Sequence, residues 1–206
     1  MTEEQAHVEE VDVPRSSHAT TKSQLRSLID WMVVVVVALG AALLIRMFVF
    51  QQFYISGPSM QTTLFNDNRV LVNKLSYHLH GIHRGDVVVF DRVTTTAGSV
   101  NHDDLIKRVI GLGGDTVEIK KCVVYVNGDA LTEKYLNKDD LAQTDLANRC
   151  RVVNMDKKTV PDGQIFVMGD NRPESYDSRM FGPIDEDLVV GRAFMVVWPL
   201  GRIGFL

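Results

Sequence analysis

One apolar run limits how this chain can fold more than any other feature of its sequence. From Trp31 to Ile45 it reads WMVVVVVALGAALLI and contains no charged residue. In a helix, about 20 such residues cross the ~30 Å hydrocarbon layer of a bilayer. A buried helix of a soluble protein is the alternative, but five consecutive valines are unusual there. We therefore predict a transmembrane helix over residues 28–50.

The residues before this run indicate how the helix is oriented. Arg15, Lys22 and Arg26 lie on its N-terminal side, and segments rich in Lys and Arg usually stay in the cytoplasm. The run starts too late for a cleaved secretory signal, because the polar residues 1–27 precede it. We expect an uncleaved single-pass anchor with a cytoplasmic N-terminus. Residues 1–27 contain few large apolar side chains, so they are predicted to form a disordered cytoplasmic tail.

Residues 51–206 are predicted to form a mainly β, extracytoplasmic domain built from antiparallel sheets. Helical periodicity is scarce after residue 65, and short β-like runs alternate with turn sequences. Asn127-Gly128 is a typical hairpin turn, because both positions favour a positive φ. Residues 121–160 are expected to form an insertion or second subdomain. The predicted strands are Arg69–Asn73, Asp86–Arg92, Leu105–Gly111, Thr116–Lys120, Val123–Val126, Gln164–Met168 and Arg192–Trp198.

Charge and cysteine content limit the partners and bonds available to this domain. The net charge of −4 leaves no broad basic surface, so we expect no nucleic-acid partner. Cys122 and Cys150 are the only cysteines. Outside the membrane they are able to pair, but their separation in space does not follow from the sequence. A disulfide and two free thiols therefore both remain open.

Ser59 and Lys107 are candidates for a catalytic pair that needs no histidine. Gly57 and Pro58 form a turn sequence that can expose the Ser59 hydroxyl, although most serines in turns are structural. Lys107 lies in an apolar run, where burial disfavours the ammonium ion and lowers the lysine pKa. A neutral lysine can accept the proton of a serine nucleophile. In the alternative, Lys107 faces solvent; its neighbour Arg108 is expected on the wet face of the strand.

A third polar segment runs from Gly169 to Gly182 and reads GDNRPESYDSRMFG. Its composition is compatible with an ordinary surface loop. However, Asp177 and Arg179 are able to pair, and Ser175 or Ser178 is able to orient an uncharged lysine by a hydrogen bond. Support of this kind is what a precise catalytic site requires.

Together these segments resemble bacterial type I signal peptidases with one N-terminal membrane anchor. The matching motifs are the nucleophile box Ser59–Leu64, the Gly-Asp-Val strand Arg84–Phe90, the lysine box Lys107–Asp115 and the box Gly169–Gly182, all in the family's order. The resemblance covers nearly all of residues 28–206. It implies a serine endopeptidase of the bacterial cell membrane. Such an enzyme removes N-terminal signal peptides from exported preproteins after Ala-x-Ala-like residues.

The resemblance also implies a role for individual residues. Ser59 is expected to be the nucleophile and Lys107 the general base, with Ser175 hydrogen-bonded to the lysine amine. Asp177 and Arg179 are expected to form a supporting salt bridge. The Ser59 backbone N–H would bind the oxyanion.

Further residues are implied to support the site or to contact substrate. Asp170 and Asn171 are expected to keep the last box in shape. The expected partners are signal peptides of secreted preproteins, the lipid bilayer and the protein-export machinery, and no cofactor or metal is expected. Substrate-binding residues, taken by position alone, are Ile55, Met60, Leu105 and Ile106.

Three positions depart from the family pattern. Thr62 and Gly113 stand where the family usually has proline, so we expect somewhat looser turns next to the site. Some relatives use a serine hydroxyl two residues before the nucleophile for the oxyanion. Gly57 stands at that position here, and Ser56 lies one residue earlier.

Other functions are less consistent with the sequence. A non-cleaving relative that assists assembly of surface structures such as pili would be expected to lack the serine or the lysine, and both are present. A self-cleaving serine–lysine protease of the repressor type is disfavoured by the membrane span. The sequence His-x-His-x-x-His at 78–83 is not expected to bind metal, because no cysteine or carboxylate stands at typical ligand spacing.

Overall fold

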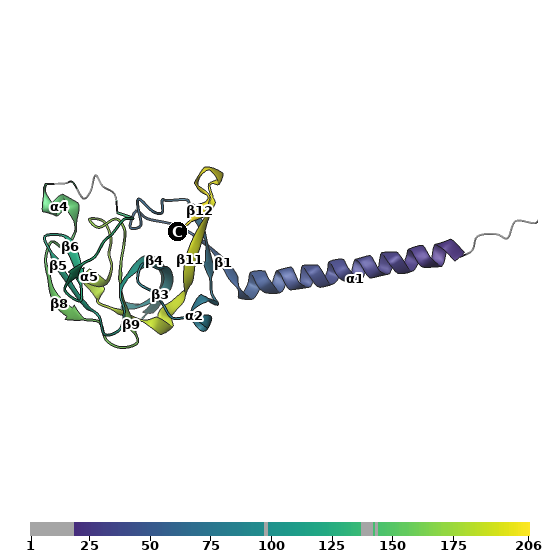
Figure 1. Ribbon diagram of the computed structural model, residues 1–206, viewed down its shortest axis with the longest axis horizontal. Helices are drawn as coiled ribbons and strands as arrows, with labels where there is room; N and C mark the ends of the chain where they lie inside the picture. Colours follow the sequence, from purple (N-terminus) through teal and green to yellow (C-terminus); the bar gives the residue numbers. More distant parts are fainter. Residues whose placement is uncertain (1–18, 97–98, 137–141, 143) are drawn as a thin grey trace, which may run out of the picture. The chain divides into compact units, whose positions relative to one another are not determined.

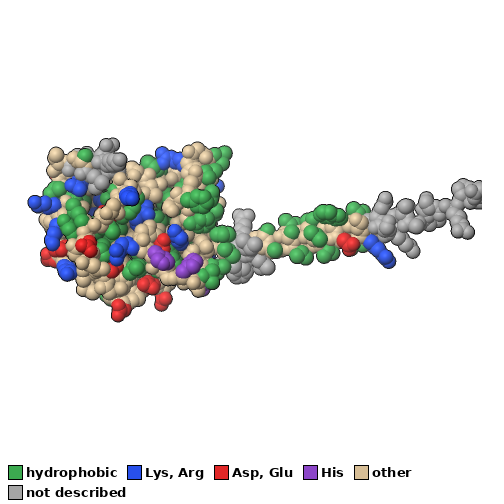
Figure 2. Space-filling view, viewed as in Figure 1, with side chains coloured by type: hydrophobic (Ala, Val, Ile, Leu, Met, Phe, Trp, Pro, Cys, Tyr) green, Lys and Arg blue, Asp and Glu red, His purple; other side chains and the backbone are tan. Residues whose placement is uncertain are grey.

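The computed structural model describes residues 19–96, 99–136, 142 and 144–206 (Figure 1). It divides the chain into two compact units, residues 1–44 and 45–206. The helix α1, Ala19–Phe48, contains the segment Arg26–Leu43, which is long and apolar enough to cross a membrane. Exposed apolar side chains lie along most of its described length in Figure 2, and charged side chains stand only near its N-terminal end. This helix suggests a membrane anchor.

The bounds of α1 differ from the prediction at both ends. The helix ends at Phe48 instead of residue 50, and it begins at Ala19, so residues 19–27 are helical although disorder was predicted for them. An apolar helix that has already formed extends into polar residues easily, because propagation costs less than nucleation. The predicted disorder of residues 1–18 lies outside the described residues.

The second unit is mainly antiparallel β, as predicted. Its larger sheet has eight strands in the order β1-β2-β11-β3-β4-β9-β10, with β12 paired to β11 (Figure 1). Each strand pair in the described residues is antiparallel. The strands of this sheet are β1 Phe50–Tyr54, β2 Arg69–Asn73, β3 Val87–Thr96, β4 Ser99–Gly111, β9 Gln164–Met168, β10 Ile184–Asp185, β11 Val189–Trp198 and β12 Gly204–Phe205.

A smaller sheet of four strands has the order β7-β6-β5-β8. The predicted turn Asn127-Gly128 connects β6 to β7, and both residues have positive φ, 56° and 94°. Near this sheet, Cys122 and Cys150 form a disulfide. The subdomain was predicted to begin at residue 121, but the smaller sheet already includes β5, which precedes that residue and pairs with both β6 and β8. The strands are β5 Thr116–Lys120, β6 Val123–Val126, β7 Asp129–Ala130 and β8 Met155–Thr159.

Short helices complete the described part of this unit. The α-helices are α2 Ser76–Leu79, α4 Leu146–Arg149 and α5 Ser178–Phe181, and the 3-10 helices are η1 Glu186–Leu188 and η2 Leu200–Arg202.

The core explains why β4 is held firmly. On the neighbouring strand β3, Val87 and Val89 pack into one apolar cluster, while Val88 and Phe90 pack into another. An uninterrupted apolar run of this kind is typical of a strand buried on both faces. A third cluster joins β4 and β9 to the smaller sheet, with Ile110, Phe166 and Met168 packed against residues of β5 and β6. The strand that carries Lys107 therefore lies among three packed clusters.

Candidate active site

A tight turn holds Ser59 next to the apolar core of the larger sheet, with its side chain partly exposed. Gly57 has φ +102°, a region that favours glycine, and its N–H donates to the Asn66 side chain at 2.7 Å. The turn continues with a bond from the Gln61 N–H to the Pro58 carbonyl at 3.0 Å. Beyond it, Met60 is buried in the core. Ser59 itself is half-buried, so its hydroxyl stays open to an approaching group.

Lys107 reaches this hydroxyl from the centre of β4. Its Nζ donates to Ser59 Oγ at 2.7 Å and to the Ile106 carbonyl at 2.9 Å, and the residue is only 3% exposed. Burial lowers the pKa of Lys107 to about 8, although the nearby carboxylates of Asp177 and Asp170 oppose the shift. The amine is therefore much easier to deprotonate than an ordinary lysine, and it already touches the hydroxyl that would need a base.

The lowered pKa of Lys107 predicts how the rate of cleavage would depend on pH. If neutral Lys107 is the reactive form, kcat/KM should rise about tenfold per pH unit at low pH and level off above a pKa of about 8. Initial rates on a soluble peptide with an Ala-x-Ala site, measured between about pH 6 and pH 10.5, would test this. An inflection near the ordinary lysine pKa of about 10.4 would contradict a desolvated base.

The predicted salt bridge between Asp177 and Arg179 is present and almost completely buried. Arg179 Nε and one terminal nitrogen donate to the two oxygens of Asp177 at 2.7 and 2.6 Å. The Gly169 N–H donates to the same carboxylate at 3.0 Å. Burial alone would raise the pKa of Asp177, but Arg179 and the Gly169 N–H outweigh it and hold the pKa below its usual value. The charged pair thus ties α5 to the end of β9.

Asn171 joins the last box directly to the nucleophile turn. Its backbone N–H donates to the Ser59 carbonyl at 3.0 Å, and its side-chain amide donates to the Pro58 carbonyl at 3.1 Å. The prediction gave this residue a supporting role within its own box. Asn171 does bond Glu174 within that box, and its other contacts hold the loop that carries the serine.

Asp170 binds the lysine strand through an arginine that was misplaced in the prediction. Arg108 was expected on a wet face, but it is 7% exposed and donates to both Asp170 oxygens at 2.9 and 2.7 Å. The Thr63 hydroxyl also donates to Asp170. Burying the guanidinium is tolerable because a carboxylate from the loop after β9 neutralises it. The sequence held a sign of this pair: a charged residue, Arg108, stands inside an apolar strand, and an acidic residue, Asp170, stands in the last box.

Ser175 lies next to the dyad without the bond that was predicted for it. Its side chain is fully buried, and its hydroxyl is close enough to the Asp177 carboxylate to help lower the pKa of that group. In the described residues, the bonds of the Lys107 amine go to Ser59 and Ile106 instead. Gly169 packs against both Ser175 and the Ser59 carbonyl. Ser175 therefore lies between the nucleophile turn and the Asp177–Arg179 pair.

A cleft of about 110 Å³ opens beside Ser59 and Lys107. Three of the predicted substrate-binding residues, Ile55, Leu105 and Ile106, line it. Met60 does not line it, because its side chain is buried in the core beneath the turn. The other lining residues are Phe53, Tyr54, Ser56, Val89 and Asp104.

One of the two departures from proline has a packing explanation. A Cβ on Gly113 would lie 3.1 to 3.2 Å from backbone atoms of Pro161, Asp162 and Gly163. The glycine therefore allows two turns to approach closely at the edge of the smaller sheet. Gly113 was expected to loosen a turn next to the site. Its close neighbours are instead residues 161–163, in the turn before β9.

Comparison with known proteins gives a consistent assignment. Residues 28–198 match the family described as "Signal peptidase, peptidase S26". The chain is 38% identical over 172 residues to "Probable signal peptidase I-2" of Synechocystis sp., which covers 84% of this chain and 72% of that relative. It is 35% identical over 187 residues to "Signal peptidase IB" of Staphylococcus aureus, with 87% and 94% covered. A crystal structure of a signal peptidase I from Enterococcus faecalis aligns with a TM-score of 0.42 and 33% identity, over 54% of this chain and 95% of that one.

Proposed function

This chain belongs to the signal peptidase family, peptidase S26, whose members are serine endopeptidases, and on that basis we propose that Ser59 and Lys107 are its catalytic dyad. The observation that carries the proposal is the 2.7 Å contact between the Lys107 amine and the Ser59 hydroxyl. The same amine is buried and has a lowered pKa. A nucleophile within hydrogen-bond reach of its base is the usual arrangement in covalent catalysis.

In the proposed mechanism, Lys107 takes the Ser59 proton as Oγ attacks the carbonyl carbon of the scissile peptide bond. The Ser59 N–H stabilises the resulting oxyanion. The lysine ammonium then protonates the leaving amine, and an acyl-enzyme remains on Ser59. Lys107 next removes a proton from water, which hydrolyses the ester and releases the signal peptide. We propose that Ser175, which is buried next to the nucleophile turn, accepts a hydrogen bond from the ammonium while it exists.

The proposed substrates are exported preproteins with small, Ala-x-Ala-like residues before the cleavage site. The cleft beside Ser59 is small and partly lined by the apolar residues Ile55, Leu105 and Ile106, which supports small apolar side chains as ligands. We place α1 in the cell membrane with a cytoplasmic N-terminus, which puts residues 51–206 outside, where preproteins emerge from the export machinery. Tethering to the same membrane as the substrate would raise the effective concentration of the cleavage site. A non-cleaving assembly role is not favoured, since serine and lysine are both present and in contact.

Replacing Ser59 with alanine tests this proposal. The full-length wild-type protein in detergent should cleave a preprotein that carries an Ala-x-Ala site, and N-terminal sequencing of the product should place the cut after that site. Ser59→Ala should leave the preprotein intact within the assay time, because no other group in the dyad can form the acyl-enzyme. Undiminished cleavage by Ser59→Ala would overturn the assignment.

The controls for this experiment come from the same chain. Ser99→Ala changes an exposed serine at the start of β4 and should leave the rate unchanged. A metal chelator should also leave it unchanged, because the proposed mechanism has no metal-dependent step.

A further inference from the structure

The segment Leu131–Leu136 follows β7 and reaches two buried arginines beside the catalytic boxes. Arg172 donates through both terminal nitrogens to the Glu133 carboxylate, one of these bonds at 3.0 Å. The side chains of this pair are only 7% and 8% exposed. A buried, two-pronged ion pair holds its partners in one geometry far better than a surface pair does.

Arg172 connects this pair to the box that supports the dyad. Its Nε donates to the Gly169 carbonyl at 3.2 Å, and its own carbonyl accepts from Arg179 at 2.9 Å. Gly169 is the residue that packs against the Ser59 carbonyl and Ser175. A movement of Arg172 can therefore reach the nucleophile through two contacts, from Arg172 to Gly169 and from Gly169 to Ser59.

Tyr135 supports the second arginine from the same segment. Its hydroxyl donates to Glu133 at 2.7 Å, and the Arg108 guanidinium lies 4.0 Å from the centre of its ring. Arg108 holds Asp170 and is the chain neighbour of Lys107. Glu133 thus contacts Arg172, which supports the loop next to Ser59, and Tyr135 contacts Arg108, the neighbour of Lys107.

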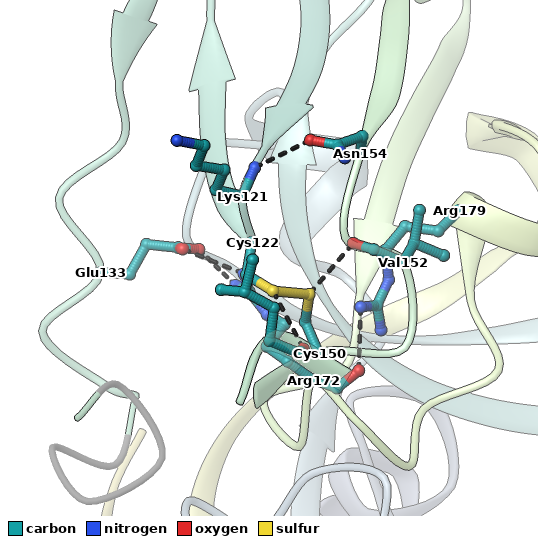
Figure 3. Close-up of a disulfide and its surroundings, with 9 residues drawn as sticks. Lys121, Cys122, Glu133, Cys150, Val152, Asn154, Arg172 and Arg179 are labelled. Carbon is teal, nitrogen blue, oxygen red and sulfur yellow. Dashed lines mark hydrogen bonds and ion pairs between the residues drawn. A yellow bond between two sulfur atoms is a disulfide. The ribbon is translucent and has the colours of Figure 1, made fainter. Parts of the chain in front are cut away.

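The disulfide closes the loop to which this segment belongs. Figure 3 shows the Cys122–Cys150 bond beside Glu133 and Arg172. Immediately after the bridge, the Arg151 N–H donates to the Arg172 carbonyl at 3.2 Å. The bridge therefore restrains both the chain around Glu133 and one of the direct contacts of Arg172.

We propose that Glu133 is a positioning residue for the Ser59–Lys107 pair, that it acts through Arg172, and that the Cys122–Cys150 disulfide keeps it in place. This inference rests on the proposed function. Without the carboxylate, the buried guanidinium loses its counter-charge and draws in water or moves outward. Gly169 then loses a restraint, and the apolar surroundings of Lys107 become wetter. The chemical step slows, while Glu133 and Arg172 do not themselves line the cleft proposed to bind the peptide.

Glu133→Gln is the first test, because it removes the charge and keeps the shape. We expect kcat to fall by about 10-fold to 100-fold, the loss typical of a small misplacement, with KM changed less than about twofold. The inflection of the pH profile should also move above its wild-type position, since added water favours the ammonium form of Lys107. The charged groups that act on this amine, Asp177, Asp170 and Arg179, are retained.

A matched control separates positioning from loss of folded protein. Glu118→Gln breaks an ion pair with Lys120 on β5 of the smaller sheet, whose side chains are 25% and 59% exposed, unlike the buried Glu133–Arg172 pair. It should leave kcat, KM and the pH profile unchanged.

Tyr135→Phe is a second, milder variant that keeps the ring and removes one bond to Glu133. It should change kcat and the pH profile in the same direction as Glu133→Gln, by a smaller factor. The double variant of Glu133→Gln with Arg172→Gln should be no slower than the slower single variant.

Reduction of the disulfide is the second test. Dithiothreitol supplies two electrons and two protons; the S–S bond breaks to two thiols, and the reagent becomes a cyclic disulfide. The reduced wild-type protein should show the same fall in kcat and the same shift of the profile. The double variant Cys122→Ser with Cys150→Ser should match it and should not respond to the reagent.

The outcomes distinguish this inference from the proposed function. If the wild-type protein cleaves and Ser59→Ala does not, the function stands. If Glu133→Gln and reduction then leave kcat and the pH profile as in wild type, the positioning role is overturned alone. If they lower only the amount of folded protein, with kcat per folded enzyme and the profile unchanged, it is overturned as well. If the wild-type protein does not cleave, both are overturned.

Discussion

Lys107→Met is expected to reduce kcat by about 10⁴-fold or more while the protein stays folded. Loss of the base leaves the Ser59 hydroxyl as a weak nucleophile, and removing one member of a nucleophile–base pair costs nearly as much as removing the whole set. Methionine has nearly the length of lysine and no charge, so it fits the 3% exposed site without an uncompensated buried group. We therefore expect an unchanged or higher melting temperature together with the loss of activity.

The measurement pairs single-turnover cleavage with thermal unfolding of the same preparation. Lys157→Met, at an exposed position on β8, is the matched control and should retain full activity. Residual cleavage by Lys107→Met above about a tenth of wild type would exclude the lysine as the base, since such a loss is far smaller than a missing base produces.

Gly169→Ala is expected to disable the enzyme without changing any catalytic group. A Cβ at this position would overlap the Ser175 Oγ and the Ser59 carbonyl oxygen. The serine side chain can rotate, but the carbonyl belongs to the nucleophile's own backbone and accepts a bond from the Asn171 N–H at 3.0 Å. The turn must therefore shift. We expect kcat to fall by about 100-fold or more, and stability to fall by about 1–3 kcal/mol from overpacking.

A glycine elsewhere in the domain provides the comparison for this substitution. A Cβ on Gly81 would meet no atom within 4 Å, so Gly81→Ala should leave activity and melting temperature close to those of wild type. If Gly169→Ala retained wild-type kcat, the close packing between the last box and the nucleophile turn would not matter for catalysis. Denaturant midpoints for both variants would show whether the loss comes from the site or from unfolding.

Local patterns along the chain were sufficient to predict most of the fold. The apolar run Trp31–Ile45 predicted the long helix, because its signal depends only on length and composition. The Asn127-Gly128 turn and the alternating burial of β5 and β6 follow from backbone preference and a period of two. The ends of α1 were less accurate, because helix ends depend on weak local preferences.

For the candidate site, the motifs predicted residues that the structure brings together, but they did not predict all of the contacts. Ser59 and Lys107 were paired from residue type and spacing, and the structure brings them to 2.7 Å. Asp177 and Arg179 were also paired. The bond from Ser175 to the amine is absent from the described residues, and Met60 is in the core. Which atom a buried hydroxyl bonds, and which side of a turn faces a cleft, depends on packing that no local pattern encodes.

The sequence by itself therefore determined the apolar helix, the mainly β class and the two candidate catalytic residues, since each depends on residues close together or on residue type. Only the tertiary structure decided that Arg108 is buried against Asp170, that Gly169 touches the nucleophile turn, and that Glu133 reaches Arg172 beside a disulfide. Each of these contacts joins segments from different strands and loops. Their geometry exists only once the two sheets have packed, because burial and charge pairing are properties of the assembled core.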